Sequence, residues 1–391
     1  MAGLGDTIEL SLIKQMEMLA MSQPGVISLA QGIPSFDTPE PIKRRSVEAI
    51  NEGRVAQYSS SSGLSDLRED IEDELERDGM SYDFAKEIIV TAGSIEAICA
   101  TLLAILDPGD EVILPSPTYT SYVQAILVAR GVPIFIPLHE ESGWTLDLDC
   151  LKNKLTSRTR AILLCNPNNP TGSIFSKKQL LAIGAIAESY NLIILTDEVY
   201  KDFIYDKEAK NNFFTLASIS ALRHRVVRIF SFSKAYAMTG WRIGYLHTDR
   251  ALAQRILRVH DSLITCAPVV SQHAAMAALR LKPHELQHYI DEYMVRRQIL
   301  CDGLNALDEY FSHTVPAATY FVFPKIKIKM FPAYNGSFSF AKELLEKVNL
   351  AVVPGIAFGP EGEHHLRLSF GRSRHDINEG LRRLSVFIKM I

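Results

Sequence analysis

The sequence predicts an α/β fold built on a mainly parallel sheet, and three observations support this prediction. Between about residue 87 and residue 250, short apolar runs rich in β-branched residues alternate with segments of helical periodicity. Several of these runs are almost wholly apolar, which is typical of strands covered by helices on both faces. Polar motifs follow several of the runs, at the strand ends where open α/β sheets bind their ligands.

We expect seven strands in this sheet, with helices in the gaps between them. The predicted strands are Ile88–Thr91, Glu111–Leu114, Ile134–Pro137, Ala161–Cys165, Leu192–Thr196, Val226–Ser231 and Arg242–His247. The clearest predicted helices between them are Ser94–Leu106, Thr118–Arg130 and Lys177–Ser189. Taken alone, this alternation would also fit many Rossmann-like enzymes.

The sequence changes character after about residue 285. A long helical pattern covers Pro283–Asp308, and a final helix is predicted over Arg374–Lys389. Between them we expect a pair of strands punctuated by proline, Thr319–Phe323 and Ile326–Met330. This part of the chain therefore indicates a second, smaller structural region.

Composition and charge narrow the classes of function. The chain has 391 residues, 47% of them hydrophobic and 22% charged, as in an ordinary globular protein. A net charge of −4 with no basic patch makes nucleic acid and anionic membranes poor partners. We expect no transmembrane helix and no signal peptide, because no apolar stretch is long enough and the start lacks the signal pattern. The five cysteines lie far apart, so we expect buried free thiols in the cytoplasm and no metal site.

The most informative motif is the run Ser231–Arg242, which reads Ser-Phe-Ser-Lys-Ala-Tyr-Ala-Met-Thr-Gly-Trp-Arg and begins where a predicted strand ends. A lysine at a strand end, here Lys234, can lie in a low-dielectric site, lose its proton and attack a carbonyl group. Serine hydroxyls and the planar guanidinium of Arg242 are the donors that a phosphate needs. The run therefore suggests pyridoxal phosphate (PLP), bound to Lys234 as a Schiff base. A solvated surface lysine is the alternative.

Three further motifs follow predicted strands. Asn166–Gly172 reads Asn-Pro-Asn-Asn-Pro-Thr-Gly, and a turn closing a βα unit would explain its prolines and glycine. Asp197 could cap a helix, or it could lie buried beside a pyridine ring and keep the ring nitrogen protonated. The Gly93-Ser94 turn could be an ordinary helix cap, or it could bring a helix N-terminus to an anion.

In these motifs the chain resembles the class I/II, fold-type I aminotransferases, also called the aspartate aminotransferase superfamily. The resemblance covers essentially the whole chain. It implies a large α/β/α domain with a mainly parallel seven-stranded sheet over residues 45–285. Residues 1–44 and 286–391 would form a discontinuous, smaller α+β domain. It also implies PLP as cofactor, and ping-pong transfer of an amino group between an amino acid and a 2-oxo acid through Lys234.

The resemblance assigns roles to individual residues. Lys234 would carry the cofactor and move the proton, with Asp197 on the pyridine nitrogen and Tyr200 on the phenolic oxygen. The other cofactor ligands implied are Ser94, the Ile95 backbone, Ser231, Ser233 and Arg242 at the phosphate, Tyr119 stacked on the ring, and Asn169 on the phenolic oxygen. Tyr58 matches a tyrosine that reaches the phosphate of a neighbouring subunit, which implies a homodimer with shared active sites.

Substrate recognition is implied for Arg367, Asn169, Gly32 and Ile33. Arg367 stands in an apolar run, where an unpaired guanidinium would be costly, and the family match makes its partner the substrate α-carboxylate. In the aspartate-specific subgroup a lysine at the Ile95 position pairs with the distal carboxylate, and that charge is missing here. We therefore expect a neutral, aliphatic or aromatic substrate side chain, with Ile33 and Tyr119 as pocket walls.

Three alternatives to an aminotransferase stay open at this point. A PLP lyase or synthase of the same fold, of the β-elimination, decarboxylation or aminocyclopropane-carboxylate synthase type, would use the same Lys234 and Asp197. A regulatory module of this fold is not expected, because residues 1–44 are too few for the DNA-binding domain that such modules carry. The last alternative is an α/β binding protein that holds no PLP.

Overall fold

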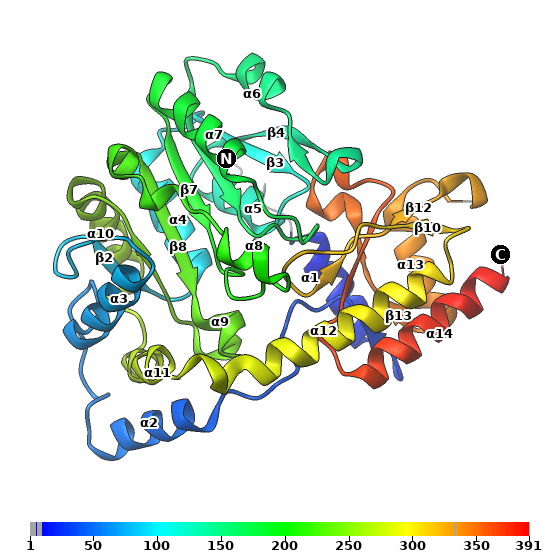
Figure 1. The fold of residues 1–391 in the computed structure, drawn as a ribbon, viewed down its shortest axis with the longest axis horizontal. Coiled ribbons are helices and arrows are strands. Elements are labelled where there is room, and N and C mark those ends of the chain that lie inside the picture. The colour runs from blue at the N-terminus through cyan, green and yellow to red at the C-terminus, as the bar shows by residue number, and fades with distance from the viewer. Residues whose placement is uncertain (1–4, 6–9, 332–333, 391) are drawn as a thin grey trace.

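An eight-stranded sheet dominates the computed structural model, which describes residues 5, 10–331 and 334–390 (Figure 1). The strands are β2 (Ile88–Thr91), β3 (Glu111–Ser116), β4 (Val132–His139), β5 (Thr145–Leu146), β6 (Thr159–Cys165), β7 (Ile193–Asp197), β8 (Val226–Ser231) and β9 (Gly244–His247). Their spatial order is β2-β9-β8-β7-β6-β3-β4-β5. Strand β9 is antiparallel to both neighbours and β5 to β4, whereas the other pairs are parallel. The predicted α/β fold with a mainly parallel sheet is confirmed.

Two details of the predicted sheet were wrong. The sheet has an eighth strand, β5, whose two residues are too few to give a periodic pattern. The last strand begins at Gly244 rather than at Arg242, because a short 3-10 helix, Thr239–Trp241, precedes it. Arg242 then adopts a left-handed backbone conformation with φ of 52°, which cannot continue a strand.

Helices cover both faces of the sheet (Figure 1). They are α3 (Ser65–Arg77), α4 (Ser94–Ile105), α5 (Ser121–Val128), α6 (Leu148–Lys154), α7 (Lys177–Ser189), α8 (Lys207–Asn211), α9 (Phe232–Ala235), α10 (Arg250–Ile264) and α11 (Val269–Leu279). Helix α7 has the predicted bounds, because the Ser176 side chain and Gln179 form a capping box that fixes its start. Helix α5 is shorter at both ends than predicted.

The remaining elements form a smaller region beside the sheet. Its helices are α1 (Leu12–Met21), α12 (Pro283–Asn305), α13 (Ser337–Val348) and α14 (Arg374–Met390), whereas α2 (Glu40–Asn51) packs on α11, apart from α13 and α14 (Figure 1). Its strands are β1 (Ile27–Ser28), β10 (Phe311–Ser312), β11 (Phe321–Val322), β12 (Lys325–Ile326), β13 (Leu350–Ala351), β14 (Val353–Pro354) and β15 (Leu366–Ser369). Strand β1 pairs with β13, so the two ends of the chain meet here. The proposed boundaries at 44/45 and 285/286 fall inside α2 and α12, and the two-domain division stays a prediction.

The strand pair predicted in the C-terminal region was wrong. Strand β11 pairs with β15, and β12 pairs with β10, so the two do not form a hairpin. Only Phe323 and Pro324 separate them. A two-residue hairpin needs positive φ in its loop, and proline is fixed near −65°.

The structure shows the state of the cysteines, the hydropathy of the helices and the grouping of possible metal ligands. All five cysteines are free, but only Cys165 and Cys301 are buried; Cys99, Cys150 and Cys266 are partly exposed, against the prediction. Among the described residues, no helix is long and apolar enough to cross a membrane. The same residues contain no group of three or more His, Cys, Asp or Glu side chains placed to hold a metal ion.

Candidate active site

A cavity of about 270 Å³, which we call the first cavity, lies at the carboxyl ends of the central strands. It brings together residues from both regions of the chain that the sequence motifs had singled out. These are Gly32, Ile33, Ser94, Ile95, Tyr119, Asn169, Asp197, Tyr200, Ser231, Ser233, Lys234, Arg242 and Arg367. Tyr58 is not among them, since its side chain is 83% exposed on the surface.

The serines of the lysine run form one end of the first cavity. Ser231 ends β8 and caps α9, accepting a hydrogen bond from the Ser233 N–H (3.2 Å). The Ser231 and Ser233 hydroxyls lie 2.9 Å apart, and both side chains are buried. Helix α4 begins beside them at Ser94, so its free N–H groups and positive dipole end add to an anion site.

Arg242 packs against the turn before α4. Its Nη2 donates to Ala92 O (3.2 Å), and its Nη1 donates to Thr239 O (3.0 Å). Gly93 has φ of 87°, and a Cβ there would come within 2.7 Å of Arg242 Nη2. The glycine therefore supplies a left-handed turn and also leaves room for the guanidinium beside the serines.

Asp197 ends β7 at the other side of the first cavity and is 3% exposed. Its Oδ2 accepts a hydrogen bond from Tyr122 Oη (2.8 Å), and its Oδ1 accepts one from the Val199 N–H (3.2 Å). Burial raises the pKa of this carboxyl to about 6, although both hydrogen bonds oppose the rise. The next residue, Glu198, forms instead a buried ion pair with Arg228 (2.6 Å), away from the first cavity.

Lys234 lies on the four-residue helix α9, directly after Ser233, and lines the first cavity together with Asp197. Its Nζ donates a hydrogen bond to Gly32 O (2.6 Å), which links the N-terminal segment to the sheet. Burial and the positive charges of Arg367 and Arg242 lower the pKa of this amine to about 8. At this pKa about a tenth of the amine is neutral at pH 7 and able to act as a nucleophile or base, far more than for an ordinary lysine.

Arg367 lies on β15 and is 2% exposed. Its Nη1 donates to Asn169 Oδ1 (3.2 Å), its Nη2 donates to Ala30 O (2.6 Å), and its Cζ lies 4.2 Å from the centre of the Phe321 ring. Its Nε is buried and has no hydrogen-bond partner among the described residues. Burial lowers the pKa of the guanidinium, and a carboxylate ligand would offset that cost.

Several residues of the first cavity were not predicted from the sequence. Tyr122 in the first turn of α5 follows Tyr119 by three residues, and the two rings meet edge to face at 5.4 Å. That i, i+3 spacing was a signal that could have identified it. Helix α1 contributes Lys14 and Glu17 from a segment that carries no motif, so only the packing of the chain reveals them.

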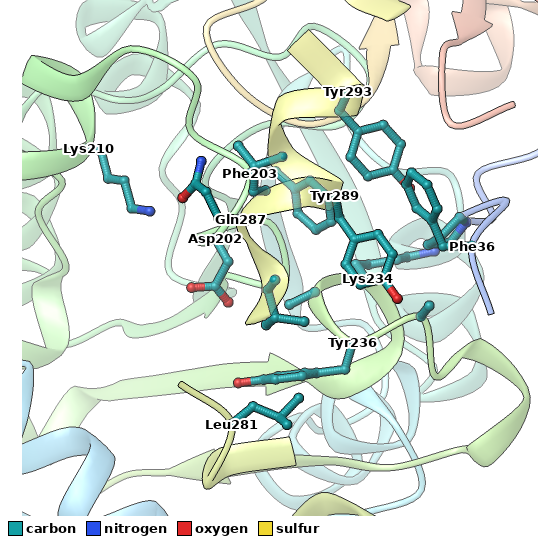
Figure 2. Close-up of a pocket in the computed structure, with 15 residues that line it drawn as sticks. Phe36, Asp202, Phe203, Lys210, Lys234, Tyr236, Leu281, Gln287, Tyr289 and Tyr293 are labelled. Carbon is teal, nitrogen blue, oxygen red and sulfur yellow. The ribbon is translucent and has the colours of Figure 1, made fainter. Parts of the chain in front are cut away.

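A second cavity, of about 280 Å³, shares Lys234 with the first (Figure 2). Phe36, Tyr289 and Tyr293 lie together on one side of it, whereas Asp202, Gln287 and Lys210 lie on the other. The two serines, Asp197 and Arg367 do not line it. We therefore place the chemistry in the first cavity.

The residues of the first cavity fit PLP. The serines, Arg242 and the N-terminus of α4 suit a phosphate, Asp197 suits a pyridine nitrogen, and Tyr119 offers an aromatic face. Since Asn169 Oδ1 accepts from Arg367, its NH₂ group is the end left to donate to a ligand oxygen. Lys234 supplies an amine to the same cavity.

Comparison with known proteins agrees with this reading. Residues 24–384 match the family of class I and II aminotransferases. The chain is 33% identical over 392 residues to an aromatic-amino-acid aminotransferase of Thermococcus litoralis, covering 99% of this chain and 98% of the relative. It is also 33% identical to an aspartate aminotransferase of Pyrococcus abyssi, covering 98% and 97%. The solved alanine aminotransferase of Pyrococcus furiosus superposes with a TM-score of 0.92 at 29% identity, covering 100% of both chains. The chain therefore belongs to the class I and II aminotransferases, enzymes that use PLP to transfer amino groups.

Proposed function

We propose that the first cavity binds PLP and transfers amino groups between neutral amino acids and 2-oxo acids through the residues described above. The observation that carries the proposal is the position of Lys234. Its amine, with a lowered pKa, lies in one cavity with the phosphate donors, with Asp197 and with the buried Arg367. One small molecule in this cavity could therefore contact the amine of Lys234, the phosphate donors, the carboxylate of Asp197 and the guanidinium of Arg367.

The roles proposed for the cofactor ligands are those that the family resemblance implies, and the place of each residue on the first cavity supports them. Ser94, the Ile95 N–H, Ser231, Ser233 and Arg242 hold the phosphate, and Tyr119 covers one face of the ring. Asp197 stabilises a proton on the pyridine nitrogen, while Asn169 and Tyr200 donate to the phenolic oxygen. When bound, PLP supplies a carbonyl carbon for amino groups and a protonated ring that withdraws electrons.

The substrate is held and deprotonated by residues of this chain. Arg367 binds the α-carboxylate and thereby fixes the position of Cα. Neutral Lys234 Nζ would remove the proton from Cα of the amino acid and pass it to the cofactor, and in the second half-reaction the same amine would carry a proton back from the cofactor to Cα of the 2-oxo acid. One amino acid and one oxo acid enter, and their counterparts leave, in two half-reactions of a ping-pong sequence.

The walls of the first cavity favour a neutral substrate side chain. By the family resemblance Ile95 stands in place of a lysine that binds a distal carboxylate, and Ile33, Tyr119 and Phe321 add apolar surface to the first cavity. Burying a second carboxylate against such walls would be costly without an unpaired cation, and the further lysine of the lining, Lys14, is ion-paired with Glu17 (2.6 Å). The relatives are named for aromatic, aspartate and alanine substrates, so overall similarity does not select among these classes.

Quaternary structure and compartment are part of the proposal. Tyr58 is exposed and lies outside the first cavity of its own chain, which suits a side chain that completes the site of a second subunit. We therefore expect a homodimer with shared sites. The five free cysteines suit the reducing cytoplasm.

The test is the absorbance of the purified, PLP-loaded enzyme on addition of single amino acids without any oxo acid. The panel is glutamate, aspartate, alanine, leucine, phenylalanine, tyrosine, lysine and arginine. We expect the visible absorbance to bleach with neutral amino acids and the matching 2-oxo acid to appear. Bleaching with aspartate faster than with every neutral amino acid would overturn the proposed substrate class. Absence of bleaching with all eight would contradict the proposed half-reaction.

A further inference from the structure

A buried histidine and a buried carboxylate lie together beside the turn that opens α4. His260 of α10 is fully buried, and the side chain of Glu96, in the first turn of α4, is 11% exposed. His260 Nδ1 lies 3.0 Å from Glu96 Oε1, and His260 Nε2 lies 2.9 Å from Ser61 O. Neither residue belongs to the described lining of the first cavity, so the pair has no part in the roles proposed above.

The two partners of the imidazole ring determine its charge. Ser61 O is a carbonyl oxygen, which only accepts hydrogen bonds, and the carboxylate of Glu96 also only accepts them. Each ring nitrogen therefore needs a proton to make its contact, and a ring with two N–H groups is a cation. The geometry thus describes a buried ion pair, in which the imidazolium of His260 neutralises Glu96.

Glu96 is bonded to the phosphate end of the first cavity. Its Oε2 accepts a hydrogen bond from the Ala92 N–H (3.1 Å), and Ala92 O accepts one from Arg242 Nη2 (3.2 Å). Glu96 and Arg242 therefore hold the same residue of the turn from its two polar groups. A carboxylate so close to an anion site would oppose phosphate binding unless a cation compensated its charge.

We propose that His260 is a positioning residue of the phosphate site. Its imidazolium compensates the charge of Glu96, so that Glu96 fixes the turn at Ala92 without repelling the phosphate of PLP. This inference deepens the proposed function and rests on it, since the phosphate must bind beside Arg242 for the charge of Glu96 to matter. The pair acts through hydrogen bonds and charge, and no covalent step is added.

The same ring also holds the loop that carries Tyr58. His260 Nε2 donates to Ser61 O, and the Ser61 hydroxyl donates to Oδ1 of Asp261, the next residue on α10 (2.6 Å). Tyr58 is the side chain proposed to complete the phosphate site of a second subunit. His260 is thus bonded to both segments that would contact a phosphate, and its loss should affect phosphate binding more than binding of the pyridine ring.

The contribution of the phosphate is isolated by comparing PLP with pyridoxal, which lacks the phosphate. Titration of the cofactor-free, full-length protein with each compound, followed by visible absorbance, gives two dissociation constants. We expect His260→Gln to weaken PLP binding about tenfold, as for loss of one hydrogen bond to a charged group, and pyridoxal binding by less than about twofold. Glu96→Gln should not weaken PLP binding, because glutamine still accepts from the Ala92 N–H but carries no charge.

The double variant tests whether charge compensation is the reason for the loss. If it is, His260→Gln should weaken PLP binding much less in the Glu96→Gln background than in the native one. Equal losses in the two backgrounds would overturn the compensating role. Unchanged PLP binding in His260→Gln, or equal losses of PLP and pyridoxal, would overturn it as well.

Two controls separate this role from folding and from the proposed function. His365→Gln is the matched control, since His365 Nε2 contacts the Glu140 carboxylate (3.3 Å) outside the first cavity, and it should leave the ratio of the two dissociation constants unchanged. Arg242→Gln should weaken PLP binding and spare pyridoxal. Its failure to do so would refute the phosphate site itself, whereas a loss in Arg242→Gln without one in His260→Gln would refute the role of His260 alone.

Discussion

The two cavities that meet at Lys234 have nearly the same volume, about 270 and 280 Å³, but different chemistry. The first places Asp197 and Arg367 on the same enclosed space as the lysine. The second is walled mainly by Phe36, Phe203 and tyrosine rings. Volume alone therefore does not identify a catalytic site, whereas converging buried charges with shifted pKa values do.

The difference arises from which elements supply the walls. The first cavity collects the ends of β6, β7 and β8, where the backbone turns and side chains converge on one edge of the sheet. The second cavity lies against the side of α12, whose aromatic residues pack with Phe36 at ring distances of 4.4 and 5.2 Å. Strand ends thus concentrate functional groups, whereas the side of α12 contributes mainly packing contacts.

Replacing Lys234 by alanine should give the largest effect. We expect a loss of about 10⁴-fold in kcat, since the amine that moves the Cα proton is removed. The matched change in the second cavity is Tyr289→Phe, which should alter kcat by less than about twofold. Steady-state transamination rates of both variants measure the contrast, and near-normal turnover of Lys234→Ala would show that the first cavity is not the site of reaction.

Asp197→Asn should have the next largest effect and should separate activity from stability. We expect kcat to fall about 10²- to 10³-fold, as for loss of one preorganised electrostatic contact.

The buried carboxyl of the cofactor-free enzyme has a pKa of about 6 instead of 3.8, so its ionised form destabilises the fold above pH 6. Asparagine removes this cost, and the free energy of unfolding should rise by about 3 kcal/mol at pH 8.

The stability gained by Asp197→Asn should depend on pH in a defined range. Because the folded-state pKa is raised, the cost of Asp197 is absent well below pH 3.8, grows from there to pH 6 and is constant above. Urea unfolding of the cofactor-free protein at pH 8 and pH 5 should therefore show a smaller gain at pH 5. Equal gains at both pH values would contradict the raised pKa of Asp197.

Arg367→Lys should have an intermediate effect. Lysine keeps the positive charge but cannot form the planar pair of bonds that guanidinium makes with a carboxylate. We expect kcat/KM for amino acids to fall about 10- to 100-fold, with most of the change in KM. A kcat/KM that stays within twofold of the native value would exclude Arg367 as the α-carboxylate ligand.

The sequence predicts those structural features that depend on neighbouring residues, and it predicts poorly those that depend on contacts distant in sequence. The strands β2, β6, β7 and β8 were foreseen nearly residue by residue, because buried apolar runs give a local pattern. Asp197 and Ser231 were accordingly placed at strand ends. The start of the last strand was placed two residues early, because Arg242 is left-handed and its guanidinium packs against Gly93, a contact distant in sequence.

Other parts of the site had no local signal. Lys14 and Glu17 reach the first cavity through the packing of α1, whose sequence reads only as an amphipathic helix. The second cavity arises where α12 passes α9 and the Phe36 segment, and no motif marks it. The sheets of the smaller region were also missed, because most of their strands are two residues long and pair over long sequence distances.

The smallest predicted effect comes from a matched pair of tyrosines, Tyr122 in the first cavity and Tyr293 in the second, each 1% exposed. Tyr122→Phe removes the hydrogen bond to Asp197, which should raise the pKa of that carboxyl further above about 6. We expect kcat to fall about tenfold at pH 7 and less at higher pH, where Asp197 ionises again. The pH profile of kcat measures this shift.

Tyr293→Phe makes the same chemical change where it should not matter for activity. Tyr293 Oη is buried without a hydrogen-bond partner among the described residues, so its removal should stabilise the fold by up to about 1 kcal/mol. Its kcat and pH profile should match the native enzyme, with the stability gain measured by urea unfolding. If both tyrosines shifted the pH profile equally, the cavities would act as one electrostatic unit through Lys234. If only Tyr122 does so, catalysis is confined to the cavity that holds the charges.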